Sequence, residues 1–191
     1  MPPSPIILAF DTSAAHCAAA LLLGDRIVTR VDEMAKGQAE HLMPMLEAML
    51  AAENLTWQDL DGIGVGVGPG NFTGIRIALS AARGLALGLG KPAIGVNGFD
   101  ARVFGEALPF IATIPAPRGQ SYVQEFLADK ATDPIQIETP AHTQKSAAAL
   151  ISAVARIAAS RPNGTSERPA PLYIRSADAA PPRDPVPVLL S

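Results

Sequence analysis

The sequence has little of what marks disulfide-stabilised or nucleic-acid-binding proteins. Its one cysteine, Cys17, excludes a disulfide within the chain and suits a reducing compartment. Lysine and arginine number 15 against 18 aspartates and glutamates, which gives a net charge of -3, and no basic cluster is present. Without such a cluster the chain is not expected to bind nucleic acid unaided. Any role on RNA would therefore need a basic partner.

Histidine pairs and long uncharged apolar runs are also missing. His16, His41 and His142 stand alone, with no HxxxH or HExxH spacing, so we predict no metal site. The N-terminus lacks the cationic segment of a signal peptide, and Asp11 and His16 interrupt the apolar run from residue 6 to residue 23. These absences predict a cytoplasmic protein that makes no membrane contact.

What the chain does have is a glycine-rich segment from residue 62 to residue 90. Branched residues and glycines alternate from Ile63 to Gly68, which predicts a strand with one bare face. A glycine inside a strand costs about 0.5–1 kcal/mol relative to alanine, so a bare face implies the close approach of another backbone or of a ligand. Residues 69–71 predict a turn, and we expect Thr73 to cap a helix from Gly74 to Leu89.

Two interpretations of this segment stay open. A helix N-terminus beside a glycine turn can attract an anion, whereas tight packing of a strand against a helix needs the same glycines. The familiar phosphate loops do not match, because no Lys-Ser or Lys-Thr follows Gly74 and the stretch from 68 to 73 lacks the third glycine of GxGxxG.

Hydrophobic periodicity predicts a mixed sheet covered by helices in the first hundred residues. Pro44 lies inside one predicted helix, which therefore either begins near Leu42 or bends at the proline. Residues 56–59, TWQD, match a capping signature for a short helical turn. The predicted order is βββαβαβ, with strands at 6–10, 17–23, 27–31, 63–68 and 93–96 and helices at 38–52 and 74–89.

The rest of the chain predicts a smaller α+β lobe and a proline-rich tail. From Arg161 onward there are seven prolines, at 162, 169, 171, 181, 182, 185 and 187, so a tail that wraps the surface or lacks regular structure is expected, apart from a short run at 172–174. Strands are expected at 110–114, 121–127 and 135–137 and a helix at 146–159. The predicted domains are residues 1–100, 101–160 and 161–191.

Three segments together resemble one protein family. They are ILAFDTS at residues 7–13, GPGNFTGIRI at 68–77 and GLALG at 84–88. The chain resembles the TsaB family, also called YeaZ, over residues 6 to 98, with fainter echoes at 118–122 and 171–175. Departures from the family pattern fall at Asn71, where we expect Ser, at Gln38, where we expect His, and near Pro117, where we expect Asp.

The resemblance implies a fold and a function. The fold would be the actin-like, Hsp70-like, sugar-kinase-like (ribonuclease H-like) type, with a βββαβαβ N-terminal lobe and a shortened C-terminal lobe. The function would be that of a non-catalytic subunit in bacterial biosynthesis of threonylcarbamoyladenosine in tRNA. Its implied partners are the catalytic paralogue TsaD and the ATPase TsaE, with a homodimer in the absence of TsaD and tRNA bound only through the complex.

The resemblance also places a partner interface on the helices at 38–52 and 74–89. A methionine-rich stripe on the first helix suits a surface that repacks against a partner, although a fully internal helix stays an alternative. On the interface interpretation, Met49→Glu would abolish partner binding and leave the fold intact. The predicted interface residues are Leu42, Met45, Leu46, Met49, Phe72, Ile75, Arg76, Leu79 and Arg83.

A nucleotide site is the remaining candidate for chemistry. Relatives of the implied fold place a carboxylate near magnesium and hydroxyls near phosphate at the position of Asp11. We therefore expect ATP or ADP with magnesium, if bound at all, at Asp11, Thr12, Ser13, Gly68 and Gly70, at the interface of the complex. No residue is predicted to be catalytic, and Cys17 is expected to be packed rather than nucleophilic. The rival hypothesis is a stand-alone nucleotide-dependent small kinase or ATPase that uses the same residues.

Overall fold

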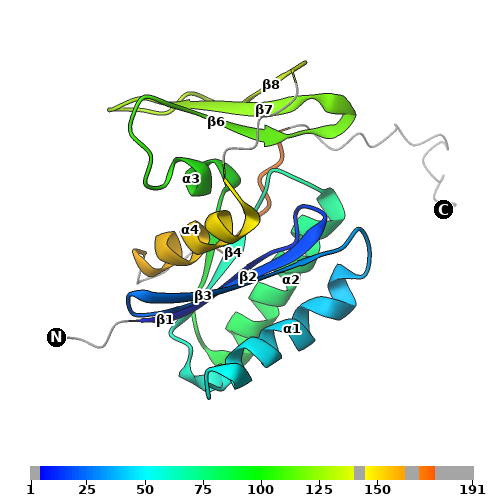
Figure 1. The fold of residues 1–191 in the computed structure, drawn as a ribbon, viewed down its shortest axis with the longest axis vertical. Helices are drawn as coiled ribbons and strands as arrows, with labels where there is room; N and C mark the ends of the chain where they lie inside the picture. Colours follow the sequence, from blue (N-terminus) through cyan, green and yellow to red (C-terminus); the bar gives the residue numbers. More distant parts are fainter. Residues whose placement is uncertain (1–4, 140–144, 162–167, 175–191) are drawn as a thin grey trace, which may run out of the picture.

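The computed structural model describes residues 5–139, 145–161 and 168–174, which form two sheets with helices packed on them (Figure 1). The first sheet has the order β3-β2-β1-β4-β5 and the second the order β6-β7-β8. The strands are β1 (Ile6–Asp11), β2 (His16–Leu23), β3 (Arg26–Glu33), β4 (Gly62–Gly66), β5 (Ala93–Val96), β6 (Phe110–Pro115), β7 (Ser121–Phe126) and β8 (Ile135–Ile137). The helices are α1 (Gln38–Ala52), α2 (Phe72–Leu89), α3 (Gly98–Val103) and α4 (Ala147–Ala159), with 3-10 turns at Trp57–Asp59 and Pro117–Gly119.

The first sheet is mixed, as predicted. Strand β1 pairs antiparallel with β2 and parallel with β4, and β4 pairs parallel with β5. Helices α1 and α2 cover one face of this sheet and α4 covers the other (Figure 1). Helix α3 packs between α4 and the second, antiparallel sheet. The mixed α/β fold class is therefore confirmed, and the predicted domain boundaries stay a prediction.

Strand β1 shows how the sequence supplies both faces. Leu8 and Phe10 point into the core beneath α1 and α2, whereas Ile7 and Ala9 point into the core beneath α4. This alternation follows from the period of two in a strand. Because helices lie on both sides, the strand reads as one continuous apolar run.

The bare glycine face of β4 is covered by α4 and by the end of β1. A Cβ built on Gly64 would lie 3.1 Å from the Cβ of Ala158 in α4 and 3.0 Å from that of Ala9. A Cβ on Gly66 would overlap the carboxylate of Asp11. Both positions thus need glycine for packing within the chain, which favours the packing interpretation of the glycine pattern.

One predicted helix start is confirmed and one was wrong. Helix α1 spans Gln38–Ala52, so of the two alternatives for Pro44 the start near Leu42 is excluded, and the proline lies inside the helix. Helix α2 is capped by Asn71, whose Oδ1 accepts a hydrogen bond from the Gly74 amide at 2.9 Å, so Thr73 is a helical residue and not the cap. The backbone of Asn71 is extended, and its short side chain reaches the Gly74 amide, which has no partner within the helix. The serine expected at this position would accept the same hydrogen bond.

Several local predictions are confirmed and one element was missed. The Thr56 and Asp59 capping box is present, and Ser146 caps α4. Helix α3 had no predicted counterpart, although Asn97 caps it through two hydrogen bonds from the amides of Phe99 and Asp100. Of the proline-rich tail, residues 168–174 form no helix or strand and the remainder from 175 lies outside the described residues.

Candidate functional site

The carboxyl ends of β1 and β4 meet next to the start of α2. These strands run parallel with Phe10 opposite Val65, so Asp11 lies beside the turn that follows Gly66. Crevices at the carboxyl ends of parallel strands are the usual ligand sites of open α/β sheets. A cavity of about 180 Å³ opens here, between the β1 end, the 68–70 turn, α3 and α4.

Four of the five predicted nucleotide-site residues line this cavity. They are Asp11, Ser13, Gly68 and Gly70. The fifth, Thr12, is fully buried and its hydroxyl donates a 2.6 Å hydrogen bond to the carbonyl of Gly74. Its hydroxyl therefore fastens β1 to α2 and does not face the cavity.

The glycine turn is packed against the chain itself. A Cβ on Gly74 would overlap the carbonyl of Thr12, and a Cβ on Gly70 would lie 2.6 Å from the carbonyl of Ser13. The Asn71 amide donates to that same Ser13 carbonyl at 2.7 Å. The close approach implied by these glycines is thus made by residues 12 and 13.

Arg102 in α3 also lines the cavity and was missed by sequence reasoning. Its Nη1 donates to the Gly98 carbonyl at 2.9 Å. Burial lowers the pKa of its guanidinium to about 10, against an opposing effect from the negative charge of Asp11. Sequence reasoning had no motif by which to find Arg102, because it is a single arginine in a short helix that was not predicted. The fold places it at the same cavity as Asp11.

Helix α4 forms the apolar wall of the cavity and limits its size. Ala147, Leu150, Ile151 and Val154 face the opening. Sites for cofactors typically measure about 300–1,000 Å³, well above the 180 Å³ available. Together with the occupied hydroxyl of Thr12, this volume does not fit a whole nucleotide within the chain.

The predicted partner interface needs a correction. Six of its nine side chains are buried in the core of the chain itself and are not available as surface contacts. The stripe at three- and four-residue spacing on α1, and its counterpart on α2, face the first sheet, because the large apolar side chains of β1 and β2 lie beneath them. These six residues are Leu42, Met45, Leu46, Met49, Ile75 and Leu79.

The remaining three, Phe72, Arg76 and Arg83, are exposed but engaged by the tail. Tyr173 stacks on Phe72 with ring centroids 5.2 Å apart, and its hydroxyl accepts from Arg76 Nε at 3.3 Å. The Arg76 guanidinium lies 3.7 Å over the Phe72 ring. Arg83 Nε donates to the Pro169 carbonyl at 3.0 Å. Residues 168–174 thus cross the outer side of α2.

A groove runs between the outer sides of α1 and α2. It consists of two adjoining hollows of about 480 and 440 Å³ that share Met43, Ser80 and Ala81. Small residues line part of it, among them Ala39, Gly84 and Gly88. We call this surface the α1–α2 groove.

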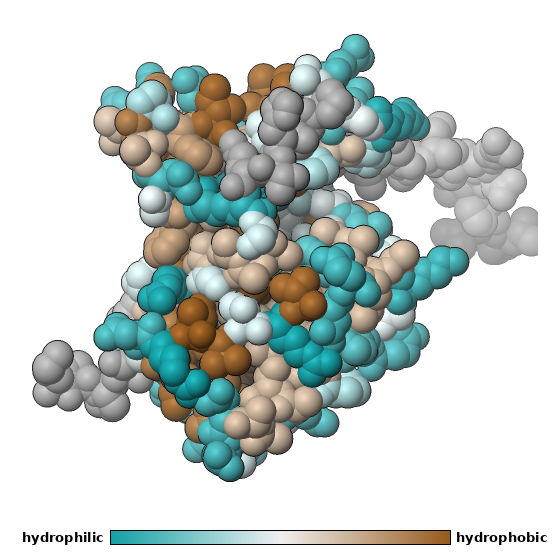
Figure 2. Space-filling view, viewed as in Figure 1, coloured by the Kyte–Doolittle hydropathy of each residue, from teal (hydrophilic) through white to brown (hydrophobic). Residues whose placement is uncertain are grey.

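Helix α2 is apolar on both sides. By length and composition it could cross a membrane, and core helices of other proteins pass the same test of length and composition. Of its apolar window, 28% is buried. Exposed hydrophobic side chains also lie on the three-stranded sheet, where Ile111 and Ile135 are 53% and 57% exposed. In Figure 2, brown atoms stand among hydrophilic ones at the top of the molecule.

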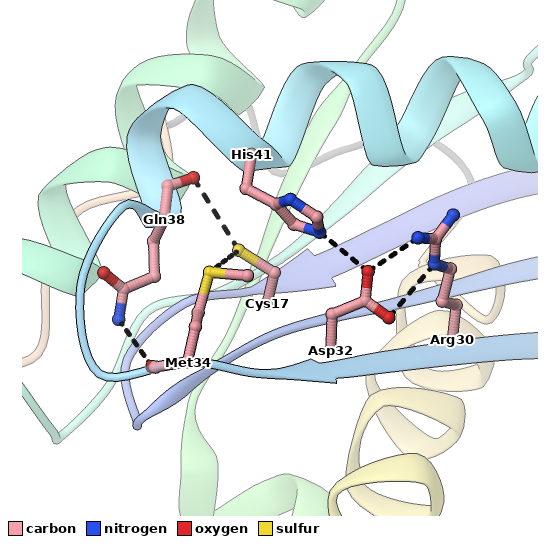
Figure 3. A network of polar contacts seen from close by, with 6 residues as sticks. All are labelled: Cys17, Arg30, Asp32, Met34, Gln38 and His41. Atoms are coloured by element: carbon pink, nitrogen blue, oxygen red, sulfur yellow. Dashed lines mark hydrogen bonds and ion pairs between the residues drawn. The ribbon is translucent and has the colours of Figure 1, made fainter.

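Cys17 is packed, as predicted, within a polar contact network at the start of α1 (Figure 3). Its Sγ lies 3.8 Å from the Met34 Sδ and 3.7 Å from the Gln38 carbonyl, and burial raises the pKa of its thiol to about 11. Beside it, Asp32 pairs with Arg30 and His41, each at 2.7 Å. This cluster joins β2, β3 and α1 and keeps the thiol protonated.

Comparison with known proteins gives consistent matches. The family model described as TsaD, tRNA N6-adenosine threonylcarbamoyltransferase, matches residues 32–150. The tRNA threonylcarbamoyladenosine biosynthesis protein TsaB of Escherichia coli (strain K12) is 31% identical over 129 residues, which cover 65% of this chain and 56% of that protein. The TsaB of Haemophilus influenzae is 31% identical over 131 residues, covering 65% and 55%.

Among solved structures, YeaZ from Pseudomonas aeruginosa has the same fold. It superposes with a TM-score of 0.72 at 23% identity and covers 89% of this chain and 100% of that chain. The chain spans just over half the length of the curated relatives it matches.

Proposed function

The chain belongs to the TsaB (YeaZ) family and contains the domain described as TsaD, and from this premise we propose that it is a non-catalytic scaffold subunit in threonylcarbamoyladenosine biosynthesis on tRNA. The names of its curated relatives support the process. The order β3-β2-β1-β4-β5 supports assignment of the first sheet to the actin-like fold type.

The observation that carries the scaffold role is the α1–α2 groove. A large apolar surface on a soluble fold marks an interaction site, and small residues along a helix let a partner helix approach closely. Only Arg76 and Arg83 interrupt the neutral surface of α2. The partner in this proposal is the paralogue TsaD, working with TsaE, and a second copy of this chain takes its place when TsaD is absent. With a net charge of -3, this subunit meets tRNA only through the complex.

The cavity argues against the rival role of a stand-alone kinase or ATPase. At about 180 Å³ it does not hold a nucleotide beside α4. A nucleotide between this chain and its partner stays part of the proposal, and calorimetric titration of ATP and magnesium into the complex and into the isolated chain tests it.

The scaffold role is tested by complementation. Deletion of the gene should remove threonylcarbamoyladenosine from digested tRNA, as measured by mass spectrometry, and the wild-type gene should restore it. Gly84→Glu should fail to restore it and should lose TsaD in pull-downs. Gly84 is exposed and a Cβ there meets nothing within 4 Å, so the variant should fold and its helix should be no weaker.

Ala149→Glu is the matched control. It places the same side chain on an exposed alanine of α4, on the opposite face of the first sheet. It should restore the modification and retain TsaD. If Gly84→Glu behaves like Ala149→Glu, the groove is not the docking surface.

A further inference from the structure

The cavity at the end of β1 has a feature that the scaffold role does not use. Arg102 projects to its wall, and among the described residues the Gly98 carbonyl is the acceptor that its guanidinium reaches. A guanidinium carries five N–H donors in a planar fork. Arg102 is half-buried, and a guanidinium that is partly withdrawn from water is stabilised by a carboxylate partner.

None of the other donors of Arg102 is both enclosed and without a partner. In the described residues, Gln136 Oε1 is the one enclosed side-chain polar atom without a partner, so no donor of Arg102 is walled off without one. Arg102 makes no ion pair at 4.0 Å or less with a described carboxylate. Because Arg102 lines the same cavity as Asp11 and Ser13, we infer that its remaining donors are available to a ligand there.

Asp11 places the opposite charge on the same cavity. Its Oδ1 accepts from the Ser13 amide at 2.6 Å, and its carboxylate lies against the bare backbone of Gly66. It acts on Arg102 through the intervening space, since its negative charge raises the arginine pKa without a direct contact. Ser13 and His16 are the other polar side chains at the cavity, and His16 begins β2.

The rest of the wall is hydrocarbon. Leu150, Ile151 and Val154 of α4 face Val96 and Ile114 across the opening. An apolar pocket with a few convergent polar groups is the common form of a small-molecule site. A cavity of roughly 150 Å³ holds one benzene molecule, so about 180 Å³ admits a ligand with few atoms.

We propose that this cavity binds a small amino acid as its zwitterion, with the carboxylate on Arg102, the ammonium group on Asp11 and a short apolar side chain against α4. One positive and one negative wall group match a ligand that carries both charges and has none overall. Inorganic phosphate matches less well, because Asp11 repels it. This site goes beyond the scaffold role and does not depend on it.

The proposal is tested by NMR titration of the full chain with L-valine. We expect amide shifts at Gly70 and Gly98 that saturate below about 20 mM. Isobutylamine lacks the carboxylate and isovalerate lacks the ammonium group, and each should bind about tenfold more weakly or worse. L-Tryptophan, which exceeds the volume, should cause no shift at these amides.

Two variants probe the site by separate routes. Arg102→Gln should weaken L-valine binding by about 10- to 100-fold, whereas Arg156→Gln, which changes an arginine of α4 outside the cavity, should not. Ala147→Met fills the cavity without touching either charge and should abolish binding. It decides the question if Arg102→Gln does not fold.

Four results would overturn the proposal: no shift up to about 20 mM L-valine, equal binding of the three small ligands, tighter binding of inorganic phosphate, or valine binding that survives Ala147→Met. None of these results bears on complementation by Gly84→Glu, so the two proposals fail independently.

Discussion

The two faces of the five-stranded sheet differ in the size of their side chains. Beneath α1 and α2 lie Leu8, Phe10 and Leu21, whereas beneath α4 lie Ala9, Ala20 and Gly64. The large side chains hold α1 and α2 away from the strands, and the small ones let α4 approach the backbone of β4. We call the α1–α2 side of the sheet, with its outer groove, the thick layer, and the α4 side, with the cavity, the thin layer.

Met49→Glu should have the largest effect on stability, because it changes a core residue of the thick layer. Met49 is 6% exposed and packs in the core, so the variant buries a carboxylate without a partner. We expect a loss of about 4 kcal/mol or more in the free energy of unfolding, measured by urea denaturation. This corrects the expectation that the variant would spare the fold and lose only partner binding.

Its control is Ala48→Glu, at the exposed neighbour on α1. That variant should remain within about 0.5 kcal/mol of wild type. Equal stability of the two variants would show that the methionine stripe is not core.

Gly64→Val should have the second-largest effect on stability, because it adds a side chain between β4 and α4 in the thin layer. Its Cβ would lie 3.1 Å from Ala158 and 3.0 Å from Ala9, closer than side chains normally pack. We expect a loss of about 2–3 kcal/mol, read from the urea midpoint. Combining it with Ala158→Gly should recover part of the loss; a variant as stable as wild type would mean that α4 does not lie against the strand.

Tyr173→Ala should have a smaller effect on the outer side of the thick layer. It removes the stack on Phe72 and the hydrogen bond from Arg76. We expect about 1 kcal/mol of lost stability and faster proteolysis of the tail segment, measured by mass spectrometry of limited digests. The stability of Tyr173→Phe, which keeps the stack, should lie between those of Tyr173→Ala and wild type. If Tyr173→Ala is digested at the same rate as wild type, the contact between the tail and α2 is contradicted.

Asp32→Asn should have the smallest effect, at the edge between the layers. Hydrogen bonds from Arg30 and then His41 lower the pKa of Asp32, so its stabilisation is present above the unfolded carboxyl pKa and is lost as the pH falls through the folded value. At about pH 6 we expect a loss of roughly 0.2–1 kcal/mol. The difference from wild type should shrink toward about pH 3, and a difference that grows with acid would contradict this sign.

Local chemistry allowed much of the fold to be predicted. The apolar run of β1, the alternation in β4, the TWQD capping box and the stripe on α1 each involve neighbours in the chain, and each element was found close to its predicted limits. The predictions were wrong where a contact between residues far apart in the sequence determines the local structure. Asn71 rather than Thr73 caps α2 because the Ser13 carbonyl fixes its amide.

The residues of the candidate site also divide into those predicted from the sequence and those that only the structure identified. Asp11, Ser13, Gly68 and Gly70 were placed together from the resemblance to the family, and the structure brings them to one cavity. Arg102 was missed and Thr12 misassigned, because neither the position of α3 nor the bond from Thr12 to Gly74 follows from spacing.

The sequence by itself determined which residues share a face of each strand and helix, and through its motifs the family, because periodicity and local turn chemistry act within a few residues. Only the tertiary structure decided what each face meets: the methionine stripe meets the sheet, and α4 returns from residue 147 to lie on Gly64. A period identifies an apolar face but carries no information on which distant segment covers it, since that choice depends on shape and volume across the whole core.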